Sequence, residues 1–232
     1  MKQINFSSVF DTLAVKQGSM NEQVQTPDGR IWEYLYATEA ISAFMIATRP
    51  ANTTVTTVSS SSNSRSQKVF ITEASAGWTV NAYCDHWIDI NTGTGAGQIA
   101  KVKGNTADTL ELYEQYALAT GLAVADSGFA ICHQPDAEKS PVTTEITPVQ
   151  GVAQVAFASG DYGYFLKRGI GGVFAGNASI TINESITTGD DTEGYGLIGT
   201  TAKGLYDENY VGRVLIAASA GDEVCLADIN VI

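Results

Sequence analysis

Apolar and polar residues alternate most regularly at the start of the last third of the chain. Residues 152–157 place apolar side chains at mostly alternate positions, and Tyr162, Tyr164 and Leu166 alternate strictly. A period of two is the pattern of a strand with one buried face. The sequence Ser-Gly-Asp at 159–161 lies between the two runs and is typical of a hairpin turn. The pattern therefore predicts two antiparallel strands joined by this turn.

Two further apolar runs, at 211–217 and 224–232, end the chain. Both are apolar enough for central strands, and an apolar terminus of this kind is normally tied into a sheet. Gly-Asp pairs separate the runs of this region at intervals of about thirty residues. We therefore expect residues 149–232 to form a β-barrel-like module.

The middle of the chain, residues 66–134, predicts a second β-module. Residues 111–125 suit a helix by composition, but Gly121 interrupts them and their apolar spacing is irregular, so a strand followed by a loop is favoured. The glycine-rich segment Asn91–Gln98 is interpreted as a hairpin loop, because a nucleotide-binding loop needs a following helix and a strand-like run follows here. The expected strands are Val69–Thr72, Trp78–Tyr83, His86–Asn91, Gln98–Lys103, Thr109–Tyr113 and Phe129–Cys132.

The N-terminal region has a less regular pattern. Residues 1–21 show no clear period, and they suit an extended arm that docks on a neighbouring subunit as well as a strand on the chain's own core. Ile31–Tyr36 follows a Pro-Asp-Gly turn and is rich in aromatic residues, which predicts a strand. Residues 37–47 suit either a helix or a strand. The serine-rich segment Ser59–Ser66 predicts a mobile loop at which mild proteolysis begins.

These patterns divide the chain into four parts. Residues 1–65 are the arm and strand region with the serine-rich loop, and 66–134 are the first β-module. Residues 135–148 hold three of the five prolines and have the composition of a linker. Residues 149–232 are the C-terminal module. The expected fold class is all-β, with small β-barrel or β-sandwich modules and an extended N-terminal arm.

Composition narrows the classes of function. A net charge of -12 repels phosphate backbones and argues against nucleic-acid binding. No apolar run approaches the length of about twenty residues that spans a membrane, and the N-terminal sequence has no apolar core for a signal peptide. Three widely separated cysteines are typical of a protein that matures in a reducing compartment.

The two histidines, His86 and His133, are not in a recognised ligand spacing, so no metal site is predicted from them. Cys132 precedes His133 directly, and on a strand the two side chains point to opposite faces. They are therefore poorly placed to share a metal or to act as nucleophile and base.

Carboxylates gather at two places in the C-terminal module. Asp190, Asp191 and Glu193 form one group, and Asp207 and Glu208 form the other. Solvated turns are the favoured interpretation, while a calcium site at the first group and a pair of glycosidase carboxylates remain open. No catalytic, cofactor-binding or metal-binding residue is assigned, and no cofactor is expected.

Four stretches, taken in order, resemble the head decoration, or cement, proteins of tailed bacteriophages. They read TPDGRIWEYLYA from residue 26, ITEASAGWTVNAYCDHWIDINTGTGAGQIAKVKGNT from residue 71, SGDYGYFLKRGIGGVFA from residue 159 and VGRVLIAASAGDEVCLADINVI at the end. The resemblance implies a structural virion protein without enzymatic activity. It also implies assembly on the capsid in the host cytoplasm, often as a homotrimer, with the major capsid protein as partner.

Other functions remain open beside this one. The strand aromatics suit a receptor-binding or carbohydrate-binding module of a tail or fibre, although strand aromatics are more often core or subunit interface. A glycan hydrolase needs two carboxylates across a cleft. The capsid-contact residues are not identified, but the N-terminal arm and the proline-rich linker are the hypothesis for them.

Overall fold

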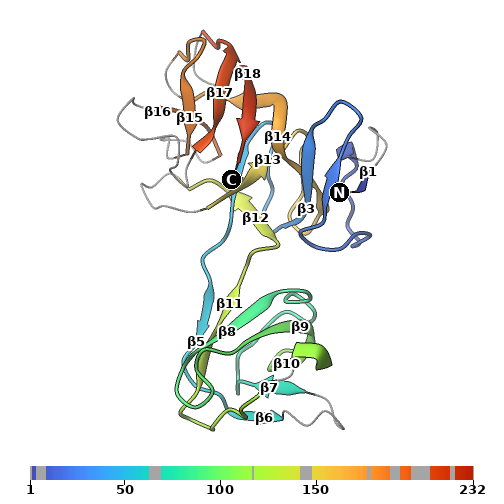
Figure 1. Cartoon of the computed structure of the whole chain (residues 1–232), viewed down its shortest axis with the longest axis vertical. Coiled ribbons are helices and arrows are strands. Elements are labelled where there is room, and N and C mark those ends of the chain that lie inside the picture. The colour runs from blue at the N-terminus through green and yellow to red at the C-terminus, as the bar shows by residue number, and fades with distance from the viewer. Residues whose placement is uncertain are drawn as a thin grey trace. The chain divides into compact units, whose positions relative to one another are not determined.

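A computed structural model describes residues 2–3, 9–62, 69–116, 118–141, 148–176, 179–188, 194–199, 210–219 and 223–231. The chain forms two compact units (Figure 1). The first unit consists of Met1–Pro50 and Pro135–Ile232, and the second consists of Ala51–Gln134. The all-β prediction is confirmed: strands dominate both units, and the described residues contain no α-helix.

The first unit contains a closed five-stranded barrel. Its strands are, in order around the barrel, β3 (Ile31–Ala37), β12 (Asp136–Lys139), β4 (Ile46–Thr48), β13 (Val149–Val152) and β14 (Tyr162–Phe174). The barrel closes because β14 pairs with β3 in antiparallel register, and it is mixed because β12 runs parallel to β3. A closed sheet leaves no free edge among these strands.

Strands β3 and β14 are buried on both faces, so the single buried face predicted for residues 162–166 is wrong. Trp32 and Leu166 lie in one apolar cluster, whereas Leu35 and Phe165 lie in another. Successive residues of a strand point to opposite faces, so each strand supplies side chains to both clusters. Such strands resemble continuous apolar runs rather than alternating ones.

Beyond the barrel, β14 continues into a second part of the same sheet. There it pairs with β18 (Val224–Asn230), which pairs with β17 (Tyr210–Ile216), followed by β15 (Ser185–Thr187) and β16 (Leu197–Gly199). Gly169 lies where β14 passes from one part to the other and has a φ of +112°. A Cβ there would lie 2.6 Å from Cγ of Arg30, so both the backbone and the close approach require glycine.

The N-terminal segment packs on the first unit from residue 9 onward. Val9 is fully buried, and the ring of Phe10 lies edge-on to Trp32 at a centroid distance of 5.6 Å. The backbone of Leu13 bridges to Tyr162, and β2 (Gln23–Gln25) pairs with β1 (Lys2–Gln3) and β3. Two alternatives were predicted for residues 1–21, and the described part packs on the chain's own core. Residues 1 and 4–8 lie outside the described residues.

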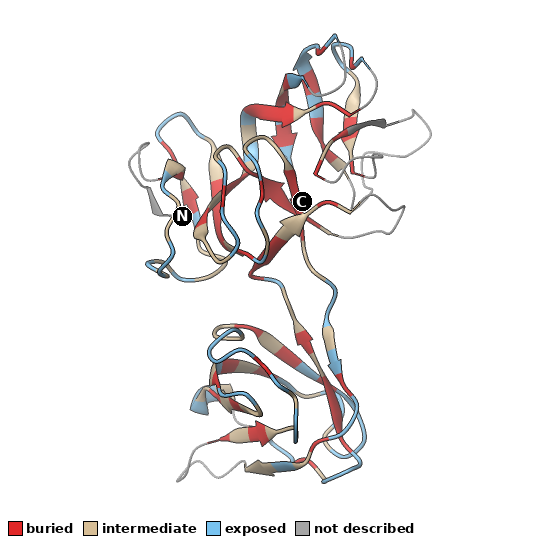
Figure 2. Ribbon diagram, turned by 180° about the vertical axis from the view of Figure 1, so that it is seen from behind, coloured by how far each residue is buried: buried red, intermediate tan, exposed pale blue. Residues whose placement is uncertain are grey.

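The second unit is a seven-stranded antiparallel sheet over the residues that the structure describes. Its order is β5 (Thr53–Val55), β11 (Gly128–Cys132), β8 (Trp87–Thr92), β9 (Ile99–Asn105), β10 (Thr109–Leu112), β7 (Phe70–Thr72) and β6 (Ser60–Ser62). Buried residues, red in Figure 2, recur along these strands. They form one apolar cluster that includes Ile88, Ile131 and Phe129.

Two local predictions in this unit are wrong. Trp78–Tyr83 is a series of turns rather than a strand, and Asn81 has a positive φ of 61° that a strand does not contain. Part of the serine-rich segment is β6, whose Ser61 pairs with Ile71, whereas residues 63–66 lie outside the described residues. The segment after β10 forms a 3-10 helix, η2 (Glu114–Tyr116), and then irregular chain, in agreement with the expected strand and loop.

The observed units cut across the four predicted parts. The first fifty residues belong with the C-terminal module because β3 pairs with β14, more than one hundred residues away in the sequence. Residues 136–139 of the expected linker form barrel strand β12; residues 142–147 lie outside the described chain. The division of the chain into units depends on pairing between strands that are distant in the sequence. Such pairing cannot be predicted from the composition of each segment.

Candidate functional site

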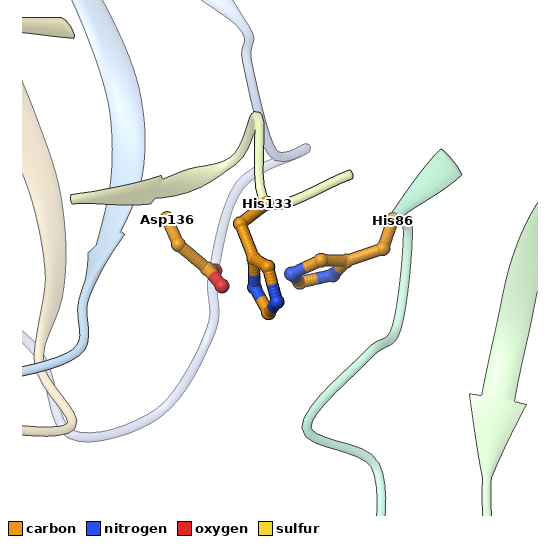
Figure 3. Close-up of side chains that lie close together, drawn as sticks. All are labelled: His86, His133 and Asp136. Atoms are coloured by element: carbon orange, nitrogen blue, oxygen red, sulfur yellow. The ribbon is translucent and has the colours of Figure 1, made fainter. Parts of the chain in front are cut away.

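Strand register brings the two histidines together. In the pairing of β8 with β11, Cys132 lies opposite Trp87 and Ile131 lies opposite Ile88. One more step along this antiparallel ladder places His133 opposite His86. Their ring centroids are 5.3 Å apart, with the ring planes at 84° (Figure 3). Asp136, which Figure 3 also draws, comes three residues after His133 in the chain and begins β12 of the other unit.

Both imidazoles extend the core-facing rows of the second unit. His86 precedes Ile88 and Ile90 at the spacing of two that keeps side chains on one face, and all three are buried. The carbonyl of His86 accepts a hydrogen bond of 2.8 Å from the amide of Val102, so strand geometry continues through His86. His133 follows Ile131 by the same spacing. The pair therefore lies at one end of the core, and only 2% of His86 is exposed.

Both imidazoles have polar partners. Nδ1 of His86 lies 3.2 Å from the carbonyl oxygen of Cys84, and Nε2 of His133 lies 2.8 Å from Oγ1 of Thr53. The ring of Tyr83 lies edge-on to both, at centroid distances of 5.5 Å from His86 and 5.7 Å from His133. These contacts orient two rings, and one nitrogen of each ring lies within 4.8 Å of a nitrogen of the other.

Spacing along the sequence missed this pair because forty-six residues separate the two histidines. The two predicted strands at 86–91 and 129–132 contained a signal for the pair. His86 begins the first strand and His133 directly follows the second, so antiparallel pairing of these strands would place the two histidines together. Cys132 occupies the alternate position on β11, so its side chain belongs to the other face.

The glycine-rich segment forms the loop between β8 and β9, as predicted. Gly93, Gly95 and Gly97 all have positive φ, between 69° and 93°, which residues with a Cβ rarely adopt. The loop is fixed by Asp126, whose carboxylate accepts hydrogen bonds from the amide (2.7 Å) and the hydroxyl (2.9 Å) of Thr94. The backbone bond, followed by the hydroxyl bond, lowers the pKa of Asp126.

The two predicted carboxylate groups are untested. Asp190, Asp191 and Glu193 lie outside the described residues, and so do Asp207 and Glu208. Solvated turns, a calcium site and paired catalytic carboxylates therefore all stay predictions at these positions.

A hollow of about 390 Å³ lies beside β9 and β10 of the second unit. Its walls mix apolar and polar side chains, among them Phe70, Val80, Asn105 and Glu111. Among the described residues of its lining, Phe70 is the single aromatic side chain that could stack on a sugar. Nδ2 of Asn105 donates 2.8 Å hydrogen bonds to the carbonyls of Thr79 and Thr106. This amide therefore connects the turn segment around Thr79 to the end of β9.

Comparison with known proteins leaves the family open. No protein-family model matches the chain, and no curated protein or solved structure matches it either. None of the helices in the described part of the chain is long and apolar enough to cross a membrane.

Proposed function

We propose that this chain is a structural virion protein that binds the outside of a tailed-phage capsid and stabilises it. Four stretches in the order typical of head decoration proteins support the proposal, and an all-β fold is in keeping with them. Its partners would be the major capsid protein and further copies of itself, with a trimer favoured.

An exposed apolar sheet face in the first unit is the observation that carries the proposal. It lies where β14, β18 and β17 run side by side, and we call it the outer face. Phe174 pairs with Val224 and Ile216 pairs with Leu226 across these strands. The outer face consists of the exposed Ile170, Ile216 and Val224 with the half-buried Leu226. Phe174 lies on the same face, but its ring packs against those of Phe44 and Tyr195. The face also carries Arg213 and Asp228, and Asp228 lies opposite Ile170.

The opposite face of the same strands is the core. Cys225, Ala227 and Ile229 alternate with the outer-face residues of β18 and are almost completely buried. In an antiparallel sheet with one face on the core, the other face is normally polar. Here Ile170 is 52% exposed, Ile216 is 59% exposed and Val224 is 42% exposed. Exposed apolar side chains grouped on one face of a sheet are typical of interaction sites.

Charge favours the outside of a capsid over its interior. A chain with a net charge of -12 is repelled by packaged DNA, whereas the outer surface of a shell imposes no such repulsion. A shell also presents the same site many times, so an oligomer that contacts several copies binds tightly even when each contact is modest.

Co-sedimentation with empty heads tests the proposal. The heads are assembled from the major capsid protein of the same phage, and the purified chain is added at increasing concentration. We expect saturable binding that I216E weakens about tenfold or more, because burial of an isoleucine contributes about 1.5–3 kcal/mol.

The matched control is I99E, which changes an isoleucine that is 64% exposed on a strand of the second unit. It should bind heads as the unchanged chain does. Absence of binding by the unchanged chain, or equal binding by I216E, contradicts the proposal. Binding to glycans without binding to heads would instead favour a tail or fibre module.

A further inference from the structure

We propose that His86 and His133 of the second unit bind a divalent transition-metal ion such as zinc, nickel or copper. This inference is independent of capsid binding, because it rests on two side chains of the second unit alone.

The hydrogen bond of His86 defines its ligating nitrogen. A carbonyl oxygen only accepts hydrogen bonds, so Nδ1 of His86 carries the proton that it donates to Cys84. The lone pair is then on Nε2. Metal-binding histidines typically donate their other N–H to a carbonyl or carboxylate, which fixes the tautomer and the ring orientation.

His133 has the complementary arrangement. When its Nε2 donates to the hydroxyl oxygen of Thr53, 2.8 Å away, the lone pair lies on Nδ1. Thr53 reaches this ring because it pairs with Ile131, two residues before His133 on the same face of β11. The hydroxyl of Thr53 can donate or accept, so a metal bound at Nδ1 of His133 would select the tautomer in which Nε2 donates to it.

The spacing of the two rings suits one shared ion. Two nitrogens bonded to a tetrahedral zinc ion at about 2.1 Å each lie about 3.4 Å apart. Ligating nitrogens of His86 and His133 lie within 4.8 Å of each other. The separation therefore has to shorten by about 1.4 Å at most when the ion binds.

The ligand chemistry selects the class of metal. Imidazole nitrogen suits zinc, copper and nickel, whereas calcium and magnesium prefer oxygen ligands. Two histidines fill half of a tetrahedral shell, which leaves two coordination positions for other ligands such as water.

NMR of the untagged, full-length chain after treatment with EDTA tests this site directly. Because the sequence contains only two histidines, the imidazole signals report both proposed ligands without overlap from others. We expect zinc chloride to shift both sets of signals in parallel, with an end point at one equivalent, and calcium chloride to leave them unchanged. A zinc titration in which neither histidine or only one responds overturns the proposal.

Three variants separate the ligands from their surroundings. H133Q should abolish the response of His86 to zinc, whereas Y83F, which alters the ring packed against both imidazoles, should keep it. T53V removes the hydroxyl that hydrogen-bonds Nε2 of His133 and should weaken binding about 10- to 100-fold. Equal zinc affinity for H133Q and the unchanged chain overturns the proposal.

Cysteines and folding need their own controls, since thiolates also bind zinc. The double variant C84S/C132S should retain the parallel shift of both histidines, and loss of that shift contradicts a site made by the imidazoles. Thermal unfolding provides a second measurement for any variant with a poor NMR spectrum. Zinc should raise the Tm of the unchanged chain and of Y83F but not that of H133Q, because a ligand that binds only the folded state stabilises it.

Discussion

Glu33 and Lys167 form an ion pair in the interior of the first unit. Oε2 of Glu33 lies 3.1 Å from Nζ of Lys167, and the two side chains are only 7% and 14% exposed. Glu33 is on β3 and Lys167 is on β14, the two strands that close the barrel. Removal of one partner of such a pair leaves a buried charge without its counter-charge.

K167M should therefore destabilise the protein by about 3–5 kcal/mol, measured as the free energy of unfolding in urea. The control is K139M in the same unit. Lys139 pairs with Glu39 at 3.5 Å, but Glu39 is 42% exposed, so the expected loss is about 0–1 kcal/mol. Equal stabilities of K167M and the unchanged chain would contradict the importance of the buried pair.

The thiol of Cys225 is protected in the folded chain. Cys225 lies on the buried face of β18, and burial raises the pKa of its thiol. Since the thiolate is the reactive form, iodoacetamide should modify Cys225 much more slowly than the half-buried Cys84 and Cys132. Mass spectrometry after timed labelling measures this order. Modification of Cys225 as fast as the other two would show that β18 is not buried as described.

At the scale of elements, the β8–β9 loop depends on one carboxylate. The pKa of Asp126 is lowered by its bonds from the amide and hydroxyl of Thr94. A folded-state pKa below the unfolded value of 3.8 means that these bonds stabilise the loop above that pH. The stabilisation is lost as the pH falls through the lower, folded-state pKa.

An NMR titration of the Asp126 carboxyl group should accordingly have its midpoint below 3.8, and the amide signal of Thr94 should follow the same curve. T94A removes the hydroxyl bond and should move the midpoint back toward the unfolded value. A midpoint at or above 3.8 in the unchanged chain would exclude the two bonds.

Strand patterns could be predicted where only one face is buried. β18 follows the apolar run at 224–232, and β9 and β10 follow runs predicted as strands, because alternation is a local property. The strand predicted at 78–83 was wrong, since its large aromatics pack from turns rather than from a pleated strand. Short strands such as β4 and β12 carry too few residues to show a period.

The histidine pair was beyond prediction from spacing for a related reason. Each histidine lies just outside the end of a strand, and only the register of β8 with β11 places them together. A shift of that register by one residue would move the whole apolar row to the opposite face, so the buried core fixes the pairing of the histidines too.

At the scale of the whole molecule, the second unit is an insertion in the sequence of the first. Thr53 near its start pairs with Ile131 near its end, so the two ends of the unit lie on neighbouring antiparallel strands. It also has an apolar cluster of its own. Domains with adjacent ends and separate cores are typically able to fold alone.

A fragment of residues 51–134 should therefore fold without the rest of the chain and give a dispersed amide NMR spectrum. The complementary chain, with residues 51–134 replaced by a short Gly-Ser linker, should keep its own cooperative unfolding transition. An unfolded fragment would show that the second unit depends on the first for its stability.

We propose that this protein acts by attachment to a capsid through its exposed surface. Electron cryomicroscopy of empty heads mixed with the purified chain tests it most directly. The account predicts added density at symmetry-related positions on the outside of the shell, reduced for I216E and retained for I99E. Heads whose outer surface stays unchanged at a saturating concentration of the chain would contradict it.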